Sequence, residues 1–175
     1  MTGTPVAAGF VVRAATEADI PVLLRLMRGL AEYERYAPNF RVTEAVLQAQ
    51  GFRSHAPGFE AMVAAAADGE VLGMAVHYTV PFTFRARPTL YLKELFVAEA
   101  ARDRGVGAAL LRALARRARE RGCGQLRWQV ARWNTGAMRF YERLGAVPDD
   151  EWVDYALDEG AIAKLSLCPP LPTPV

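Results

Sequence analysis

The chain has 175 residues, close to the ~150 residues of one typical domain, and its 52% hydrophobic and 23% charged residues exclude a disordered protein. The formal net charge of +2 is too small to draw it onto nucleic acid, and the longest apolar run, residues 61–67, is too short to cross a membrane. No basic stretch precedes an apolar one near the N-terminus, so we expect a cytoplasmic protein without nucleic-acid or membrane partners. Two lone cysteines and two histidines offer no ordinary zinc or disulfide spacing, so we expect no metal.

The first half of the chain contains patterns typical of strands and of amphipathic helices. Thr16 and Asp19 form a weak capping-box pattern ahead of apolar residues at helical spacing. Asp68 and Gly69 separate two apolar runs, which should pair as an antiparallel hairpin. The expected elements are a strand over residues 10–14, a helix ending near Tyr36, a short helix from Thr43, and strands over residues 59–66 and 70–80.

The second half alternates strand patterns with helix patterns. The expected elements are a strand over residues 89–97, a helix over 106–121, a strand over 125–130, a helix over 135–144 and a strand over 152–157. A hairpin followed by this alternation predicts an α/β fold with a mixed sheet and helices packed on both faces. We expect one domain over residues 1–168 and a disordered tail over residues 169–175, which holds four prolines.

The strand-to-helix junction at residues 102–108, Arg-Asp-Arg-Gly-Val-Gly-Ala, is typical of a phosphate site. Glycines allow close backbone approach, and the first N–H groups of a helix attract anions. A nucleotide-hydrolysing P-loop needs Lys and then Ser or Thr after its last glycine, but Ala108 and Ala109 stand there. A dinucleotide fingerprint needs a third glycine where this chain has Leu110. The remaining pattern is Arg-x-x-Gly-x-Gly.

That pattern resembles the diphosphate-binding motif of the GNAT superfamily of N-acetyltransferases. Further similar motifs stand in the right order, with Tyr-Leu-Lys-Glu-Leu-Phe-Val upstream at residues 91–97, and downstream Trp-Asn at 133–134 and Ala-Met-Arg-Phe-Tyr-Glu-Arg-Leu-Gly-Ala at 137–146. Residues 30–34 and 128–134 narrow the resemblance to the spermidine/spermine acetyltransferase-like branch, with its diamine and thialysine relatives. The resemblance covers residues 11–157 and implies a three-layer fold with a mostly antiparallel central sheet.

The resemblance also implies acetyl-coenzyme A as co-substrate and assigns residues to it. The backbone of Leu95, Phe96 and Val97 would run along the pantetheine arm. Asn134 would bond the pantetheine or the start of the next helix, and Tyr141 would be the general acid that protonates the departing thiolate. The diphosphate would be held by residues of the glycine-rich turn: Arg102, Asp103, Arg104, Gly105, Val106, Gly107 and Ala108. A homodimer with the last strand near the subunit boundary is a further implication.

The acceptor amine must lose a proton before it attacks, because a primary amine with a pKa of about 10.4 is mostly charged at neutral pH. Glu34 and Glu94 are the candidate bases, and Tyr33 with Glu34 resembles the family pair that contacts a cationic substrate. Where the branch carries a strand glutamate, this chain has Lys93. Glu94 cannot replace that glutamate without a bulge, because successive strand side chains point to opposite faces. Lys93 beside the acceptor would repel a polycation and favour an amino acid that carries a carboxylate.

These features predict an acetyl-CoA-dependent N-acetyltransferase that transfers acetyl directly to a primary amine of a small molecule: a polyamine, a diamine or an amino-acid-like compound. Two alternatives remain open, namely acetylation of a protein N-terminus or lysine, and a non-catalytic acyl-CoA-binding sensor that has kept the cofactor turn. Tyr141 argues against the sensor, because binding alone needs no general acid.

Overall fold

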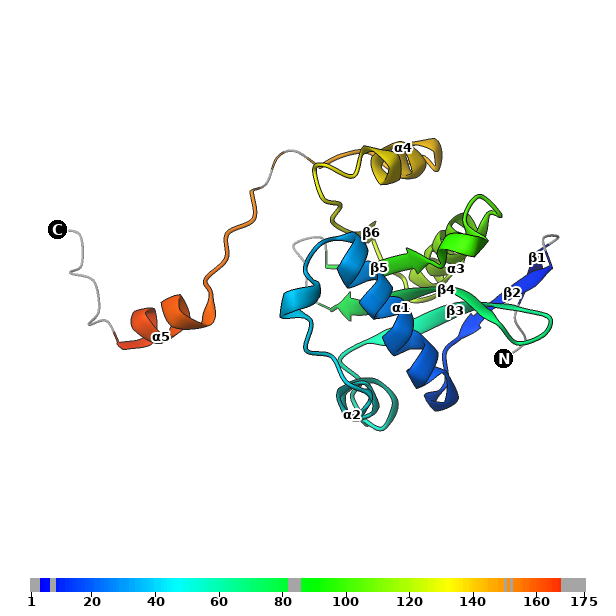
Figure 1. The fold of residues 1–175 in the computed structure, drawn as a ribbon. Coiled ribbons are helices and arrows are strands. Elements are labelled where there is room, and N and C mark those ends of the chain that lie inside the picture. The colour runs from blue at the N-terminus through cyan, green and yellow to red at the C-terminus, as the bar shows by residue number, and fades with distance from the viewer. Residues whose placement is uncertain (1–3, 7–8, 82–85, 150, 152, 168–175) are drawn as a thin grey trace. The chain divides into compact units, whose positions relative to one another are not determined.

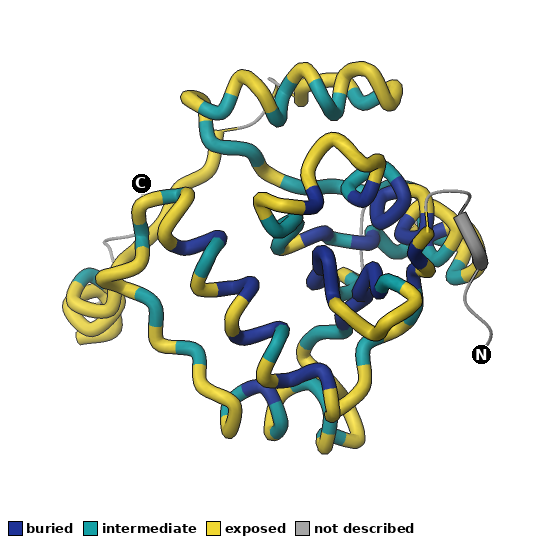
Figure 2. The backbone as a smooth tube through the Cα atoms, turned by 45° about the vertical axis from the view of Figure 1, so that its right-hand side comes forward, coloured by how far each residue is buried: buried dark blue, intermediate teal, exposed yellow. Residues whose placement is uncertain are grey.

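The computed structural model describes residues 4–6, 9–81, 86–149, 151 and 153–167. The chain divides into two compact units, Met1–Ala137 and Met138–Val175 (Figure 1). Buried residues lie in the first unit, whereas the described residues of the second unit are all exposed or partly exposed (Figure 2). The sheet and its hydrophobic core therefore belong to the first unit. The single domain over residues 1–168 stays a prediction, and the tail at 169–175 lies outside the described residues.

A six-stranded sheet forms the centre of the first unit, with its strands in chain order from β1 to β6. All neighbouring strands are antiparallel except β5 and β6, which are parallel. The mixed sheet and the antiparallel hairpin predicted from the sequence are confirmed. The strands are β1 (Thr4–Val6), β2 (Phe10–Ala14), β3 (Glu60–Ala66), β4 (Val71–Val80), β5 (Thr89–Val97) and β6 (Gln125–Arg127).

Two long helices, α1 (Ile20–Tyr33) and α3 (Val106–Glu120), cover opposite faces of this sheet (Figure 1). The apolar stripe of α1 packs on one face against Val63, Met74 and Val76. Arg117 of α3 and Arg121, which directly follows this helix, pair with Glu60 on the other face. The short helix α2 (Glu44–Leu47) begins at Thr43, whose side chain accepts the Val46 N–H as predicted for a cap. Short 3-10 helices are formed by Glu17–Asp19, Ala37–Asn39 and Glu99–Ala101, and a short π-helix by Gln48–Phe52.

Close packing at Gly73 holds the end of β5 against β4. A Cβ atom at Gly73 would lie 2.8 Å from the Phe96 carbonyl oxygen and 3.1 Å from Val106 Cγ1. Any larger residue would push β5 and the start of α3 away from β4. Gly73 therefore lets the end of β5 and the first turn of α3 lie side by side.

Three elements of the first unit differ from the prediction. Helix α1 ends at Tyr33, a turn earlier than expected. Strand β6 ends at Arg127 instead of residue 130, because only three of its residues pair with β5. Strand β1 was not expected, and its three residues are too few to show an alternating pattern.

The second unit contains no strand among its described residues. It takes up the end of α4 (Thr135–Arg143) and contains α5 (Glu159–Leu167). The predicted strand over residues 152–157 is wrong, since residues 153–157 form none, and Trp152 lies outside the described residues. Val153 and Tyr155 flank the polar Asp154, as in a strand pattern, but are 77% and 95% exposed. A strand pattern without a neighbour to supply ladder hydrogen bonds does not become a strand.

An ion pair fixes the junction between β2 and α1. Arg13 Nη1 and Nη2 donate to Asp19 Oδ2 and Oδ1 at 2.7 and 2.8 Å, and the Thr16 N–H donates to Asp19 Oδ2 at 2.7 Å. The hydrogen bond from Arg13, helped by those from Thr16, outweighs burial and lowers the pKa of Asp19. Asp19 is 7% exposed, so its charge depends on these partners.

We expect Asp19→Asn to lower the free energy of unfolding by about 2 kcal/mol, because it breaks a charge-assisted bidentate pair. Since folding lowers this pKa, the stabilisation is present above the ordinary value of 3.8 and is lost as pH falls through the folded value. Urea unfolding between pH 7 and pH 3 measures both effects. The control Glu17→Gln removes the exposed pair with Arg53 and should cost less than about 1 kcal/mol. Equal losses in the two variants would contradict the role given to Asp19.

Candidate active site

A β-bulge decides which face of the sheet carries the acidic residue of β5. In the ladder with β4, Glu94 pairs with Val76. The next pair is Leu92 with His77, so Lys93 is the extra residue on β5. The bulge breaks the alternation of side chains and puts Glu94 on the face of Val76, which α1 covers. The sequence made a role for Glu94 depend on a bulge, and the structure has one at this position.

Burial sets the acid–base properties of two carboxyl groups near the end of α1. Glu34 directly follows α1, and burial raises its pKa, while the positive charge of Lys93 opposes that rise. Burial also raises the pKa of Glu94, with Lys93 opposing the rise and the charge of Glu34 adding to it. Glu94 Oε2 is buried and has no hydrogen-bond partner among the described residues. A carboxylate of this kind is a stronger base than one in water and has an acceptor atom available for an N–H group.

Tyr36 belongs to the same cluster. Burial, together with the charges of Glu94 and Glu34, raises the pKa of Tyr36 to about 12. Its phenol therefore stays neutral and can donate a hydrogen bond beside two carboxyl groups. Glu34, Tyr36, Lys93 and Glu94 are named the bulge cluster below.

The outer edge of β5 is open beyond its first three residues. β6 pairs only with residues 89–91, and no described strand pairs with the outer edge of residues 92–97. Leu95, Phe96 and Val97 lie on this edge and are partly exposed. An extended ligand can therefore add hydrogen bonds to the edge as a further strand would.

The glycine-rich turn leads from this edge into α3. Gly105 is the N-cap residue with a φ of 78°, and the exposed residues Asp103 and Arg104 precede it. The Ala109 N–H donates to the Gly105 carbonyl oxygen at 3.0 Å, so the N–H groups of residues 106–108 have no acceptor inside the helix. No heavy atom of the described residues lies within 4 Å of where a Gly105 side chain would start. The helix therefore presents unpaired N–H groups to an open side, where its dipole favours an anion.

Arg102 lies in a stack of aromatic rings. Its guanidinium carbon is 5.5 Å from the ring centre of Tyr33 and 5.9 Å from that of Phe96. The ring centres of Tyr33 and Trp133 are 5.7 Å apart. The guanidinium carbon of Arg35 also lies 5.7 Å from the ring centre of Trp133. The sequence suggested Arg102 as a phosphate contact, whereas the structure places its side chain against rings from α1 and β5. The stack joins the end of α1, the end of β5 and the segment before α4.

Asn134 and Tyr141 both belong to the α4 region. Asn134 Oδ1 accepts the Ala137 N–H at 3.1 Å, which caps the start of α4, and the Tyr33 hydroxyl donates to the same oxygen at 3.5 Å. Tyr141 is partly exposed and lies in the second unit, with its ring 5.2 Å from that of Phe140. All of the predicted site residues except Tyr141 therefore belong to the first unit, where the structure brings them together. Tyr141 belongs to the second unit.

Sequence reasoning missed Tyr36, Arg35 and Gly29. A Cβ atom at Gly29 would lie 3.0 Å from Phe96 Cε1, so this glycine makes room for the Phe96 ring against α1. A glycine inside a helical pattern is a usable signal for such a close approach. Tyr36 and Arg35 carry no comparable signal, because their roles depend on what β5 and Trp133 place beside them.

His77 lies on the opposite face from Glu94. It is fully buried, and neither ring nitrogen has a hydrogen-bond partner among the described residues. Burial, only partly offset by the charge of Glu60, lowers the pKa of His77 to about 4. His77 is therefore neutral at physiological pH and does not belong to the bulge cluster.

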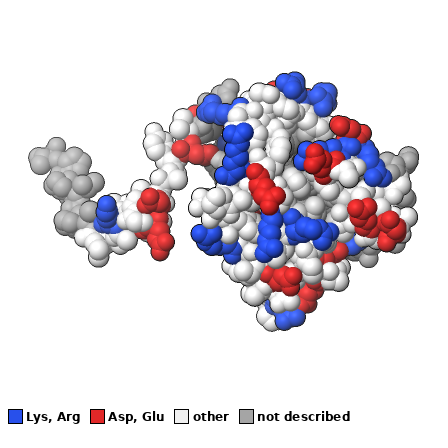
Figure 3. All heavy atoms as spheres, in the orientation of Figure 1, with Lys and Arg blue, Asp and Glu red and all other residues white. Residues whose placement is uncertain are grey.

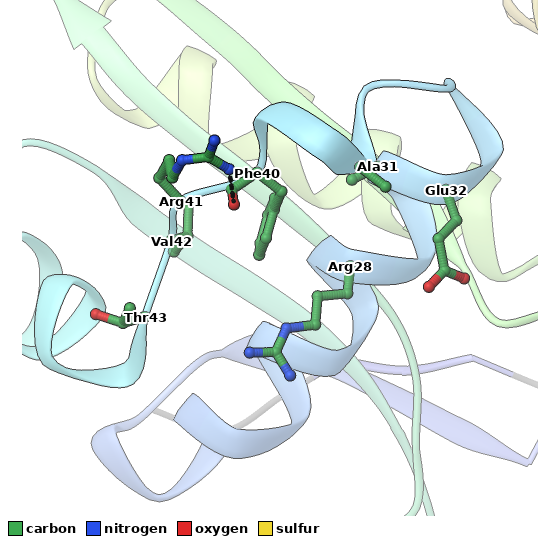
Figure 4. A pocket seen from close by; sticks show the side chains of 8 residues that line it. Arg28, Ala31, Glu32, Phe40, Arg41, Val42 and Thr43 are labelled. Carbon is green, nitrogen blue, oxygen red and sulfur yellow. Dashed lines mark hydrogen bonds between the residues drawn. The ribbon is translucent and has the colours of Figure 1, made fainter.

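A pocket of about 460 Å³ lies between α1 and residues 37–43 (Figure 4). Both polar and apolar side chains line it, and Arg41 Nη1 donates to the Pro38 and Phe40 carbonyl oxygens at 2.8 and 3.1 Å. No residue of the bulge cluster lines this pocket, so it is separate from the site described above. The lining residues are Arg28, Ala31, Glu32, Ala37, Phe40, Arg41, Val42 and Thr43.

Charges of both signs are mixed over the face drawn in Figure 3, so no large area of one sign steers a ligand there. Within the described part of the chain, no group of three or more His, Cys, Asp or Glu side chains is arranged to hold a metal ion. No helix in that part is long and apolar enough to span a bilayer.

The open edge of β5 and the glycine-rich start of α3 together form a site that can hold an extended ligand with an anionic end. Residues 25–146 match the model of the acetyltransferase (GNAT) family. The chain therefore belongs to the GNAT family and is an N-acetyltransferase.

The relatives include enzymes that act on small amines. The chain is 36% identical over 142 residues to the thialysine N-ε-acetyltransferase of Bos taurus, covering 77% of this chain and 82% of that protein. It is 26% identical to the L-ornithine N5-acetyltransferase of Arabidopsis thaliana, covering 81% of each. Among solved structures, an integron cassette protein from the mobile metagenome of V. cholerae superposes with a TM-score of 0.77 at 25% identity, covering 91% of this chain and 99% of that one.

We expect Glu94→Gln to raise the free energy of unfolding at pH 7 by about 1 kcal/mol, because it removes a buried charge that has no full set of partners. Since burial raises the pKa of Glu94, the gain should shrink as pH falls through the folded value and vanish below the ordinary value of 4.5, where both states of the wild type bind the proton. Urea unfolding at pH 7 and at pH 4.5 measures the difference.

The matched control is Glu60→Gln. Burial alone would raise the pKa of Glu60, but the hydrogen bond and charge of Arg121, with Arg117, lower it instead. We expect this variant to lose about 1–2 kcal/mol at pH 7. A loss of stability in both variants would show that Glu94 is an ordinary structural carboxylate.

Proposed function

We propose that the protein transfers an acetyl group from acetyl-CoA directly to a primary amine of a small molecule. The observation that carries this proposal is the open edge of β5, which begins beside a buried carboxyl group and ends at the glycine-rich turn. A donor lying along that edge would present its thioester end towards the bulge cluster and its phosphate end towards α3.

The residues present fit acetyl-CoA, which supplies the acetyl group as a thioester. The unpaired backbone edge at Leu95, Phe96 and Val97 suits the amide-bearing pantetheine arm, which can pair as a strand does. The free N–H groups of residues 106–108 suit the diphosphate, and Gly105 leaves space for it. Asn134, held by the start of α4, has an amide left to bond the arm.

Two proton transfers are needed, and we assign each to a residue of this chain. Glu94 accepts the proton of the acceptor ammonium, with Glu34 beside it, because burial makes both stronger bases. Tyr141 donates the proton that the departing thiolate takes up, since a phenol with a pKa of about 10 can protonate a thiolate whose basicity the site increases. Tyr33, at the end of α1, helps to hold the acceptor.

A small amine is favoured over a peptide as the acceptor. The thialysine and ornithine acetyltransferases that resemble this chain are named for small amino acids with a side-chain amine. A non-catalytic acyl-CoA sensor would gain nothing from an unpartnered buried carboxylate, which destabilises the fold. The enzyme on a small amine is therefore our conclusion, with a cytoplasmic location as the matching expectation.

We also propose a homodimer. Among the described residues of the second unit none is buried, so its apolar side chains lack a core, and exposed apolar side chains of this number are typical of an interface. A second copy of the chain would cover them. The exposed apolar residues of this unit are Leu144, Val147, Val153, Tyr155, Leu157, Ile162, Leu165 and Leu167.

Release of the coenzyme A thiol, measured with a panel of amines and peptides, tests the reaction. We expect turnover with small primary amines and a fall in kcat of at least about 100-fold in Tyr141→Phe, with the acetyl-CoA Kd unchanged, because only the proton donor is lost. Tyr155→Phe is the control, since Tyr155 is 95% exposed, and it should leave both values unchanged. Tight acetyl-CoA binding without turnover of any amine would favour the sensor, and turnover of peptides alone would favour the protein acetyltransferase.

We expect Gly105→Ala to weaken acetyl-CoA binding about tenfold, because a φ of 78° strains any side chain there and the added methyl group enters the open side of the turn. Gly69→Ala is the matched control, with a φ of 89° and equally open space but in the β3–β4 turn. Both variants should lose about 1–2 kcal/mol of stability. Calorimetric titration compares their Kd values, and equal affinities would argue against a diphosphate site at α3.

A further inference from the structure

Lys93 is exposed beside the two carboxyl groups of the bulge cluster. As the extra residue of the bulge it directly precedes Glu94, and its positive charge acts on both Glu94 and Glu34. Lys93 is exposed and takes part in none of the ion pairs found among the described residues. The cluster therefore presents two carboxyl groups and one ammonium group that remains available to a ligand.

This arrangement of charges complements some amines better than others. A polyamine or simple diamine carries only positive charges, so a second ammonium group near Lys93 is repelled. An amino acid with a side-chain amine carries two ammonium groups and one carboxylate, which matches two carboxyl groups and one ammonium. Like charges brought together discriminate against a wrong ligand as effectively as favourable contacts select the right one.

We propose that Lys93 determines acceptor specificity by binding the carboxylate of an amino acid whose side-chain amine receives the acetyl group. This inference rests on the proposed function, and it assigns Lys93 to substrate recognition and leaves proton transfer to other residues. The reacting amine lies at Glu94 and Glu34, and the carboxylate of the same molecule lies at Lys93. The bulge makes this possible, because it places a cation and a carboxylate in succession at one point of β5.

Matched acceptor pairs isolate the contribution of the carboxylate. Lysine and cadaverine, like ornithine and putrescine, differ only by one carboxylate, so the ratio of their kcat/KM values measures its recognition. We expect the wild type to favour the amino acid in at least one pair. Lys93→Gln should lower that ratio about fivefold, the effect of one exposed ion pair, and Lys93→Glu should reverse the preference. A simple monoamine such as butylamine should react at similar rates with the wild type and Lys93→Gln.

Arg28→Gln is the control, because it removes one exposed positive charge from α1 at the separate pocket. We expect it to keep the wild-type ratios. Equal ratios in the wild type and Lys93→Gln, or equal losses in Lys93→Gln and Arg28→Gln, would overturn the role of Lys93 while leaving acetyl transfer intact. A wild type that acetylates no amine at all would instead refute the proposed function and this inference with it.

Discussion

One extra residue in β5 shifts the alternation of its side chains, so that Glu94 faces α1 and shares its surroundings with Glu34 and Tyr36. Without the bulge, Glu94 would share the face of Leu92, on the side that α3 covers. The register shift therefore decides whether a carboxylate reaches the site. It also brings Lys93 to the same point of the strand, so that a single irregularity supplies both a carboxyl group and a neighbouring cation.

The carboxyl groups on the two faces of the sheet differ in whether they have charged hydrogen-bond partners. On the α3 face, Glu60 is paired with Arg117 and Arg121, which pay for its burial and keep it charged. On the α1 face, Glu94 has an oxygen without a partner among the described residues and only the exposed Lys93 to offset its burial. A buried carboxyl group without a partner lowers the stability of the fold, and such groups are found mostly at functional sites. The contrast between Glu94 and Glu60 therefore supports a site at Glu94.

The proposed donor and acceptor regions are connected by direct packing contacts. Gly73 lets the end of β5 pack beside the first turn of α3, so the open strand edge continues into the free N–H groups of the helix. Arg102 packs on Tyr33 of α1 and on Phe96 of β5, and Tyr33 also contacts Trp133. Displacement of α1 would therefore disturb both the rings beside the cofactor edge and the carboxyl groups that follow the helix.

Local patterns in the sequence determined strands β2 to β6, the long helices, the glycine-rich turn and the acetyltransferase family, because these depend on the periodicity and identity of neighbouring residues. The strand pattern at residues 153–157 failed for the complementary reason, since pairing needs a partner that local sequence does not specify. Only the tertiary structure decided that Lys93 is the bulge residue, that Glu94 Oε2 is buried without a partner among the described residues and that Tyr36 lies near it. Register and burial arise from contacts between segments far apart in the chain, so the chemistry of this site appears only once β4, β5 and α1 are packed together.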